Sequence, residues 1–361
     1  MTVRFNALTP TDDAAAVKAA IDRVVASGWF ILGPEVAAFE SEFAAMCGVA
    51  HAVGVGTGTD AITLILRGLG IGPGDEVITS PVSAAYSALA IMMAGARPVF
   101  ADIHPDRLTL DPAATAAAVT SRTRAILPVH LYGQPADLRC LESVAQRHSL
   151  ALIGDACQSH LATSEGQPIA SIGVASAFSF YPTKNLGALG DGGAVATNDS
   201  ALAERVQRLR NGGQTTKYHH VEPGANSRLD ELQAAILRAR LPFLGRWTDR
   251  RRAIAAAYRE GLRGARVTVP GEHDSGHVYH LFPVLSANRE ALQKHLAGAG
   301  VETLIHYPVP ITRQPALAST NPAECTVADR VCAQVLSLPL YPSLTDTAVR
   351  QVVSAVQRFE S

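Results

Sequence analysis

The residue best suited to chemistry in this chain is Lys184. It lies in the run Ser-Phe-Tyr-Pro-Thr-Lys-Asn at 179–185, between an apolar segment and a glycine-rich stretch that ends at Gly193. Few charged residues surround it, and burial disfavours the ammonium form of a lysine, so we expect its pKa to be lowered. A neutral lysine amine attacks an aldehyde and forms a Schiff base. A solvated lysine in a glycine-rich loop gives the same local pattern, so other segments must support this interpretation.

A second segment predicts a strand, a glycine turn and a helix. Residues 53–61 read Val-Gly-Val-Gly-Thr-Gly-Thr-Asp-Ala, and the N-terminus of such a helix favours a phosphate. Thr59 stands where a dinucleotide fingerprint needs a small residue, and the Gly-Lys-Ser/Thr of a Walker A loop is absent. What remains is a generic phosphate cup, which a tight turn without a ligand would resemble.

A third segment places an acid at the end of a predicted strand. Asp155 follows the apolar residues 151–153, and ligands of open α/β sheets collect at the carboxyl ends of strands. An aspartate there either holds a protonated heteroaromatic nitrogen or caps the next turn. Together, Lys184, Asp155 and the glycine turn describe a site for pyridoxal phosphate, with one group each for the aldehyde, the ring nitrogen and the phosphate.

Composition excludes several other classes of protein. The 361 residues are 47% hydrophobic and 17% charged with a formal net charge of −1, which argues against nucleic-acid binding and against an anionic membrane surface. The five cysteines form no CxxC pair, which argues against a zinc cluster or a disulfide framework and favours the cytoplasm. We therefore expect no metal, no signal peptide and no membrane span.

Apolar strand-like runs alternate with helical stripes over the first two-thirds of the chain. This alternation predicts an α/β fold, a mostly parallel, mixed sheet sandwiched by helices. We expect a large domain over residues 1–245 and a smaller α+β domain over residues 246–361, with the first 25 or so residues packing on the small domain. Ser-Arg-Leu-Asp at 227–230 is predicted to form a capping box for a long helix. The strand candidates are residues 52–55, 76–79, 97–101, 125–129, 151–153, 176–180, 193–197 and 278–285.

Five motifs resemble those of the DegT/DnrJ/StrS family of sugar aminotransferases. They are Gly-Thr-Gly-Thr-Asp-Ala at 56–61, Pro-Val-His-Leu-Tyr-Gly-Gln-Pro at 128–135, Asp-Ala-Cys-Gln at 155–158, the run at 179–185 and Asn-Ser-Arg-Leu-Asp at 226–230. The resemblance is collinear from about residue 33 to residue 308. It implies a fold-type-I transferase dependent on pyridoxal phosphate, with a seven-stranded sheet in the large domain.

The resemblance also implies roles for individual residues. Lys184 would hold the cofactor and Asp155 the ring nitrogen, with Gln158 near the ring hydroxyl. Gly58, Thr59 and Ser179 would bind the phosphate, joined by Asn226 from a second subunit of a homodimer. Glutamate would donate the amino group, and the ketone of a nucleotide-linked keto-deoxysugar would accept it. Candidates for the sugar-nucleotide site are Lys217, Tyr218, Arg228, Tyr307 and Tyr181.

One departure from the family pattern concerns the cofactor ring. Ala84 stands where relatives carry a stacking aromatic residue, so we expect Tyr86 or His160 to flank the ring, or small side chains to cover it. The substrate is left open among a dTDP-linked 3-keto-6-deoxyhexose, which is favoured, a 4-keto-sugar nucleotide and a keto-cyclitol. A non-catalytic regulator is the remaining alternative, and the presence of both Lys184 and Asp155 argues against it.

Overall fold

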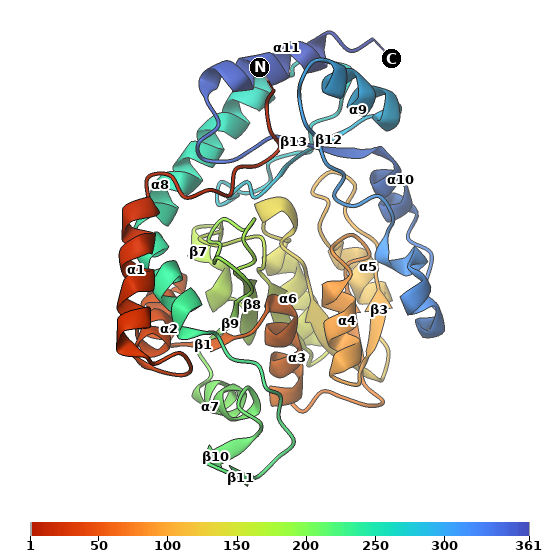
Figure 1. Cartoon of the computed structure of the whole chain (residues 1–361). Coiled ribbons are helices and arrows are strands. Elements are labelled where there is room, and N and C mark those ends of the chain that lie inside the picture. Colours follow the sequence, from red (N-terminus) through yellow and green to blue (C-terminus); the bar gives the residue numbers. More distant parts are fainter. Residues whose placement is uncertain (1, 361) are drawn as a thin grey trace.

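A seven-stranded mixed sheet forms the centre of the molecule. The structure, a computed structural model, describes residues 2–360. The strand order is β1-β9-β8-β5-β4-β2-β3, and β9 is antiparallel to both of its neighbours while the other pairs are parallel (Figure 1). The predicted mixed, mostly parallel sheet is therefore confirmed. The strands are β1 His51–Val55, β2 Glu76–Thr79, β3 Arg97–Phe100, β4 Thr123–Leu127, β5 Ala151–Asp155, β8 Ala175–Ser179 and β9 Gly193–Thr197.

Helices cover both faces of this sheet because its strands are apolar on both faces. Successive residues of β8 show this, since Ala177 packs in one hydrophobic cluster and Phe178 in the other. One cluster contains Phe39 of α2 and Leu141 of α6, and the other contains Ile65 of α3. The helices of this region are α2 Pro34–Cys47, α3 Gly58–Gly68, α4 Tyr86–Met93, α5 Pro112–Ala117, α6 Leu138–Arg147 and α7 Ser200–Leu209.

A long helix, α8 Glu231–Gly261, leads from this sheet into the C-terminal part of the chain (Figure 1). The predicted domain division at residues 245 and 246 falls inside it and stays a prediction. Tyr258 in the last turns of α8 belongs, with Phe282 and Val352 further along the chain, to a separate hydrophobic cluster. The elements there are β12 Phe282–Leu285, α9 Arg289–Gly298, α10 Thr326–Gln334, β13 Val335–Leu338 and α11 Asp346–Gln357.

The N-terminal segment contacts two different regions. Val3 forms a parallel bridge with Val301, and the ring of Phe5 stacks on that of His306 at 5.7 Å, so these first residues contact the C-terminal part. In contrast, α1 Ala14–Ser27 packs against the first half of α8, with Ala20 and Val24 around Ala235. Among the described residues, no helix is both long and apolar enough to cross a membrane.

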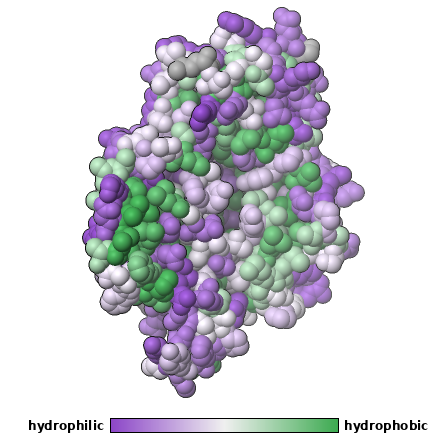
Figure 2. All heavy atoms as spheres, in the orientation of Figure 1, coloured by the Kyte–Doolittle hydropathy of each residue, from purple (hydrophilic) through white to green (hydrophobic). Residues whose placement is uncertain are grey.

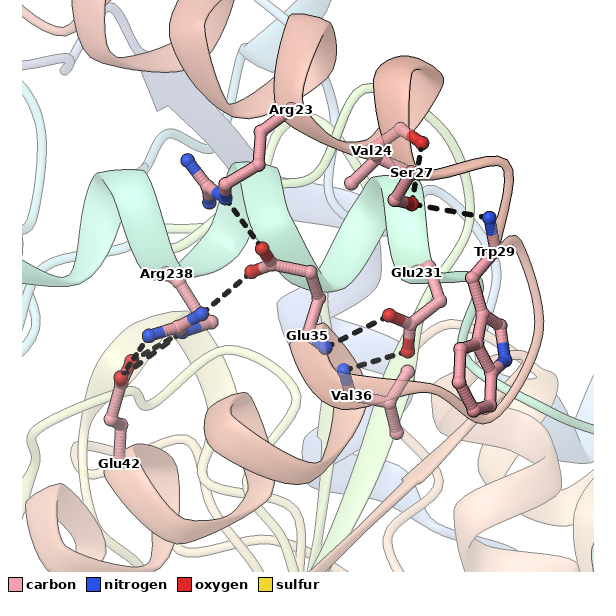
Figure 3. A network of polar contacts seen from close by, with 9 residues as sticks. All are labelled: Arg23, Val24, Ser27, Trp29, Glu35, Val36, Glu42, Glu231 and Arg238. Carbon is pink, nitrogen blue, oxygen red and sulfur yellow. Dashed lines mark hydrogen bonds and ion pairs between the residues drawn. The ribbon is translucent and has the colours of Figure 1, made fainter.

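The predicted capping box before α8 is wrong. The Ser227 hydroxyl donates to Asp60 and accepts from the backbone N–H of Gly56, so it ties the chain to the turn before α3. Glu231, the first residue of α8, accepts bonds of 2.8–2.9 Å from the backbone N–H groups of Gly33, Glu35 and Val36. Figure 3 shows this carboxylate at the start of α2. The Glu231 side chain therefore caps α2, a helix almost 200 residues away in sequence, and does not cap its own helix.

Candidate active site

Lys184 lies in the loop that follows β8, as its motif predicted. The loop is held by local bonds, since the Lys184 N–H donates to the Tyr181 carbonyl at 2.8 Å and the Ala188 N–H to the Phe180 carbonyl at 2.7 Å. The side chain is half-buried, and burial lowers the pKa of its ammonium group, an effect that Cys157 and Asp155 partly oppose. A larger fraction of this amine is thus neutral than in an exposed lysine, which suits it to attack an aldehyde.

Asp155 is the last residue of β5 and its side chain is buried. One carboxylate oxygen accepts from the Ser87 hydroxyl at 2.7 Å and the other from the Cys157 N–H at 3.2 Å. Within residues 2–360 no arginine, lysine or histidine lies within ion-pair distance of it. Lys184 acts on this carboxylate only electrostatically, without an ion pair, so a protonated ring nitrogen is a direct partner that the buried site fits.

The start of α3 is the predicted phosphate cradle, where backbone N–H groups lie close to two other segments. Thr57 caps the helix by accepting from the N–H of Asp60 at 3.0 Å, while the N–H groups of Gly58 and Thr59 have no hydrogen-bond partner among the described residues. A Cβ atom on Gly58 would lie 2.7 Å from the Cys157 sulfur and 2.8 Å from the Cβ of Ser179. Three separate segments therefore meet at this helix terminus, where free N–H groups and the helix dipole favour an anion.

Gln158 connects this site to Tyr132 and Tyr307. Its Oε1 accepts from the backbone N–H of Tyr132 at 2.7 Å, and its Nε2 donates to the Tyr307 hydroxyl at 3.2 Å. Tyr307 thus lies beside the predicted cofactor position. Tyr181, another candidate for the sugar site, is three residues from Lys184 and about half exposed.

The two residues expected to flank the cofactor ring lie in different environments. His160 is fully buried, its ring centroid 5.4 Å from that of Phe178 and 5.7 Å from that of Phe180, and burial lowers its pKa to about 3. Tyr86 begins α4 and is 63% exposed. The expectation that either covers the ring remains a prediction.

Four predicted residues lie on a loop apart from Lys184. Lys217 and Tyr218 connect β10 Gln214–Thr216 to β11 His219–His220, a hairpin next to α7 in Figure 1. The same loop is held at the far end of α3, where Arg67 donates to the Pro223 carbonyl. Asn226 is exposed, and Arg228 donates to Asn211 at 3.2 Å. Asn226 and Arg228 flank Ser227, whose hydroxyl bonds to Asp60 and to the N–H of Gly56 just before α3.

Sequence reasoning assigned no role to Ser87, Tyr132 or Cys157, although all three contact predicted site residues. Ser87 is a hydroxyl in an otherwise apolar stretch, and that polarity was the available signal. The Tyr132 contact is made by its backbone, so its side-chain type gave no signal. Among the described residues, no group of three His, Cys, Asp or Glu side chains is placed to hold a metal ion.

Comparisons with known proteins agree with this geometry. The model of the DegT/DnrJ/EryC1/StrS aminotransferase family matches residues 11–357. The dTDP-3-amino-3,4,6-trideoxy-alpha-D-glucose transaminase of Streptomyces venezuelae is 49% identical over 352 residues, covering 96% of this chain and 92% of the relative.

Two solved structures extend the comparison. DesV of S. venezuelae, in complex with a ketimine intermediate, superposes with a TM-score of 0.94 at 49% identity, covering 95% of this chain and 94% of that one. Bacillus subtilis NtdA, with bound cofactor PMP, superposes with a TM-score of 0.92 at 30% identity, covering 98% and 84%. The chain that places Lys184, Asp155 and a phosphate cradle together thus belongs to the DegT/DnrJ/EryC1/StrS family and is a pyridoxal-phosphate-dependent aminotransferase.

Proposed function

We propose that this enzyme transfers the amino group of glutamate to the C3 ketone of a dTDP-linked 3-keto-6-deoxyhexose. The observation that carries the proposal is the 49% identity, over nearly the whole chain, with a transaminase whose name specifies a 3-amino sugar on dTDP. The motifs around Lys184 are common to aminotransferases of the family and do not select the carbon. The choice of C3 therefore rests on overall similarity.

The residues around Lys184 account for how the cofactor would be held. Lys184 would bind its aldehyde carbon through Nζ, Asp155 would keep its ring nitrogen protonated, and the N–H groups of Gly58 and Thr59 would bind its phosphate together with the Ser179 hydroxyl. Pyridoxal phosphate, when bound, supplies an electron sink and carries the amino group from donor to acceptor. The Ser87 hydroxyl keeps the Asp155 carboxylate oriented towards the ring position.

Lys184 has a second role once its Nζ is released from the cofactor. Its amine is then a base whose lowered pKa suits proton transfer near neutral pH. We assign to Nζ the removal of a proton from the donor carbon and its delivery to the cofactor carbon. Neutral His160 and His306, each with its pKa lowered by burial to about 3 and about 4, leave the amine as the main base among these groups.

The enzyme is proposed to work as a homodimer with shared active sites. Lys217 and Tyr218 lie on a hairpin whose loop is held at the Arg67 end of α3, a helix about 16 Å long that begins at Gly58, so a partner subunit is the proposed recipient of these side chains. Tyr218 is 82% exposed and Trp29 and Phe30 are also exposed, as expected of an interface. The five unpaired cysteines support a cytoplasmic location within the same proposal.

A substrate panel tests the proposed acceptor. Purified enzyme would be incubated with L-glutamate and, in turn, a dTDP-linked 3-keto-6-deoxyhexose, a 4-keto-sugar nucleotide and a keto-cyclitol, with 2-oxoglutarate and the aminated product measured by mass spectrometry. Turnover of the 3-keto sugar at the highest kcat/KM supports the proposal. Preference for the 4-keto sugar or the cyclitol would reject C3 while leaving the aminotransferase intact, and no turnover of any acceptor would favour a regulatory role.

A further inference from the structure

Ala84 stands where relatives are expected to carry a stacking aromatic residue, and its backbone N–H is near the Tyr307 hydroxyl. Burial raises the pKa of the Tyr307 hydroxyl to about 12, while the side chain of Gln158 and the backbone N–H of Ala84 act to lower it. Asp155 and Cys157 act on the same hydroxyl with the opposite sign. The phenol of Tyr307, 223 positions further along the chain than Ala84, therefore lies near the Asp155 carboxylate and near Cys157.

The orientation of Gln158 follows from its hydrogen bonds. The backbone N–H of Tyr132 only donates, so the group that faces it at 2.7 Å must be the carbonyl oxygen Oε1. Nε2 therefore faces Tyr307 and donates to its hydroxyl oxygen at 3.2 Å. One of the two N–H bonds of Nε2 is used in this way, and the second has no partner among the described residues.

The hydroxyl of Tyr307 is consequently constrained as well. A phenol has two acceptor positions and one hydrogen. The Nε2–H of Gln158 donates to its oxygen, so the hydroxyl hydrogen points away from Gln158. No described residue accepts this hydrogen, and the phenol is half-buried, where an unused donor is costly. The Tyr307 O–H and the second N–H of Gln158 are therefore two neighbouring donors that have no acceptor among the described residues.

We propose that Tyr307 is a cofactor-binding residue. Its hydroxyl donates, beside the second N–H of Gln158, to the oxygen of the ring hydroxyl of pyridoxal phosphate. The proposal rests on the cofactor placement given above. A donor at this oxygen favours its deprotonated form, so the pH-dependent change in the visible absorbance of the bound cofactor occurs at lower pH.

The test is a pH titration of the visible absorbance of the cofactor-loaded resting enzyme. Tyr307→Phe keeps the ring and removes only the donor, so we expect the midpoint of the absorbance change to rise by about 1 pH unit. Tyr341→Phe, the same substitution on a tyrosine in the C-terminal part of the chain, is the matched control and should leave the midpoint unchanged. Thermal unfolding of each variant checks that it folds.

Gln158→Glu provides a second variant that tests the same hydrogen. A carboxylate can still accept from the Tyr132 N–H, but it cannot donate to Tyr307 and would instead accept the Tyr307 hydrogen. The midpoint should again rise, and by more than in Tyr307→Phe, because a negative charge is added near the ring oxygen. An unchanged midpoint in both variants would overturn the proposal.

A higher KM for the keto-sugar in Tyr307→Phe with an unchanged midpoint would also overturn the proposal, because it assigns the hydroxyl to the substrate. A wild-type protein without visible cofactor absorbance would instead contradict the proposed cofactor site itself. The two failures are therefore distinguishable.

Discussion

The proposed cofactor side of this site and its proposed sugar side are supported by the fold in different ways. Asp155, Ser179 and Gly58 lie at the ends of β5 and β8 and at the start of α3, where two hydrophobic clusters fix the backbone. In contrast, Lys217 and Tyr218 connect two short strands, and the side chains there are exposed. Figure 2 shows hydrophilic residues over the lower part of the molecule, where this hairpin lies in Figure 1.

This difference separates two requirements of an aminotransferase. Groups that act on one cofactor must be held within a fraction of an ångström, and strand ends and helix starts in a packed core provide that precision. Groups that select among sugars tolerate changes of sequence, and exposed loops can change in sequence without disturbing the packed core. The same fold can therefore keep its chemistry while its acceptor varies.

Removal of the Lys184 amine should give the largest effect of any change on the cofactor side. We expect Lys184→Ala to lower kcat by about 10⁴-fold or more, because both covalent attachment and proton transfer are lost. The visible absorbance of the purified protein, and its bleaching by borohydride, would be compared with those of Lys294→Ala, a surface lysine on α9. A Lys184→Ala variant with wild-type turnover would refute the mechanism.

Complementation between two inactive variants tests whether Asn226 serves the phosphate site of the partner subunit. Asn226→Asp places a negative charge where a phosphate is expected, and we expect it to abolish activity alone, as Lys184→Ala does. A mixed dimer has one site with both wild-type residues if the site is shared, so an equimolar reassociated mixture should recover about one quarter of the wild-type rate. Activity that stays at the level of the single variants would show that each chain supplies its own Asn226.

An added methyl group tests how tightly the phosphate cradle is built. The Cβ of Gly58→Ala would lie 2.7 Å from the Cys157 sulfur, so we expect a loss of about 1–3 kcal/mol in the free energy of unfolding and weaker cofactor binding. Gly245→Ala in α8 is the control, because nothing lies within 4 Å of its Cβ, and it should stabilise the helix by about 0.5–1 kcal/mol. Urea denaturation and cofactor titration measure both. Equal changes in the free energy of unfolding and in cofactor binding for the two variants would mean that the start of α3 accommodates a methyl group as easily as the surface of α8 does.

Acid sensitivity should also distinguish the two sides, with a smaller effect. Burial lowers the pKa of His160 to about 3, below the ordinary 6.5, so the unfolded chain binds the proton more readily. The stability contribution of neutral His160 is complete above pH 6.5 and falls as the pH drops towards 3, by about 2 kcal/mol at pH 5. Urea denaturation between pH 7.5 and 5 should show a shallower pH dependence for His160→Phe than for the wild type. His219→Phe, on the exposed hairpin, should retain the wild-type pH dependence. A pH dependence as shallow as that of His160→Phe would contradict the difference between the buried and the exposed histidine.

The sequence predicted the family, the sheet and the cofactor because their signals lie on local motifs, and the roles of the individual site residues stay predictions. The sheet followed from apolar runs such as that before Asp155, and Lys184 from a motif of seven residues. Contacts between distant segments could not be predicted in the same way. Spacing assigned Ser227 to a capping box, whereas the structure pairs it with Asp60, 167 residues away. The orientation of Gln158 depends on a backbone group of Tyr132, and no side-chain pattern encodes that.

The bond between Glu231 and the start of α2 has a consequence for assembly. It fixes the turn that carries Trp29 and Phe30, which are 56% and 52% exposed, and the Trp29 indole is further held by donating to the Ile31 carbonyl at 2.8 Å. Figure 3 shows the indole next to this carboxylate. A second chain that docks on these rings would meet side chains whose conformational freedom is already restricted. Less entropy is then lost on association, and the affinity gained comes from preorganisation within one chain.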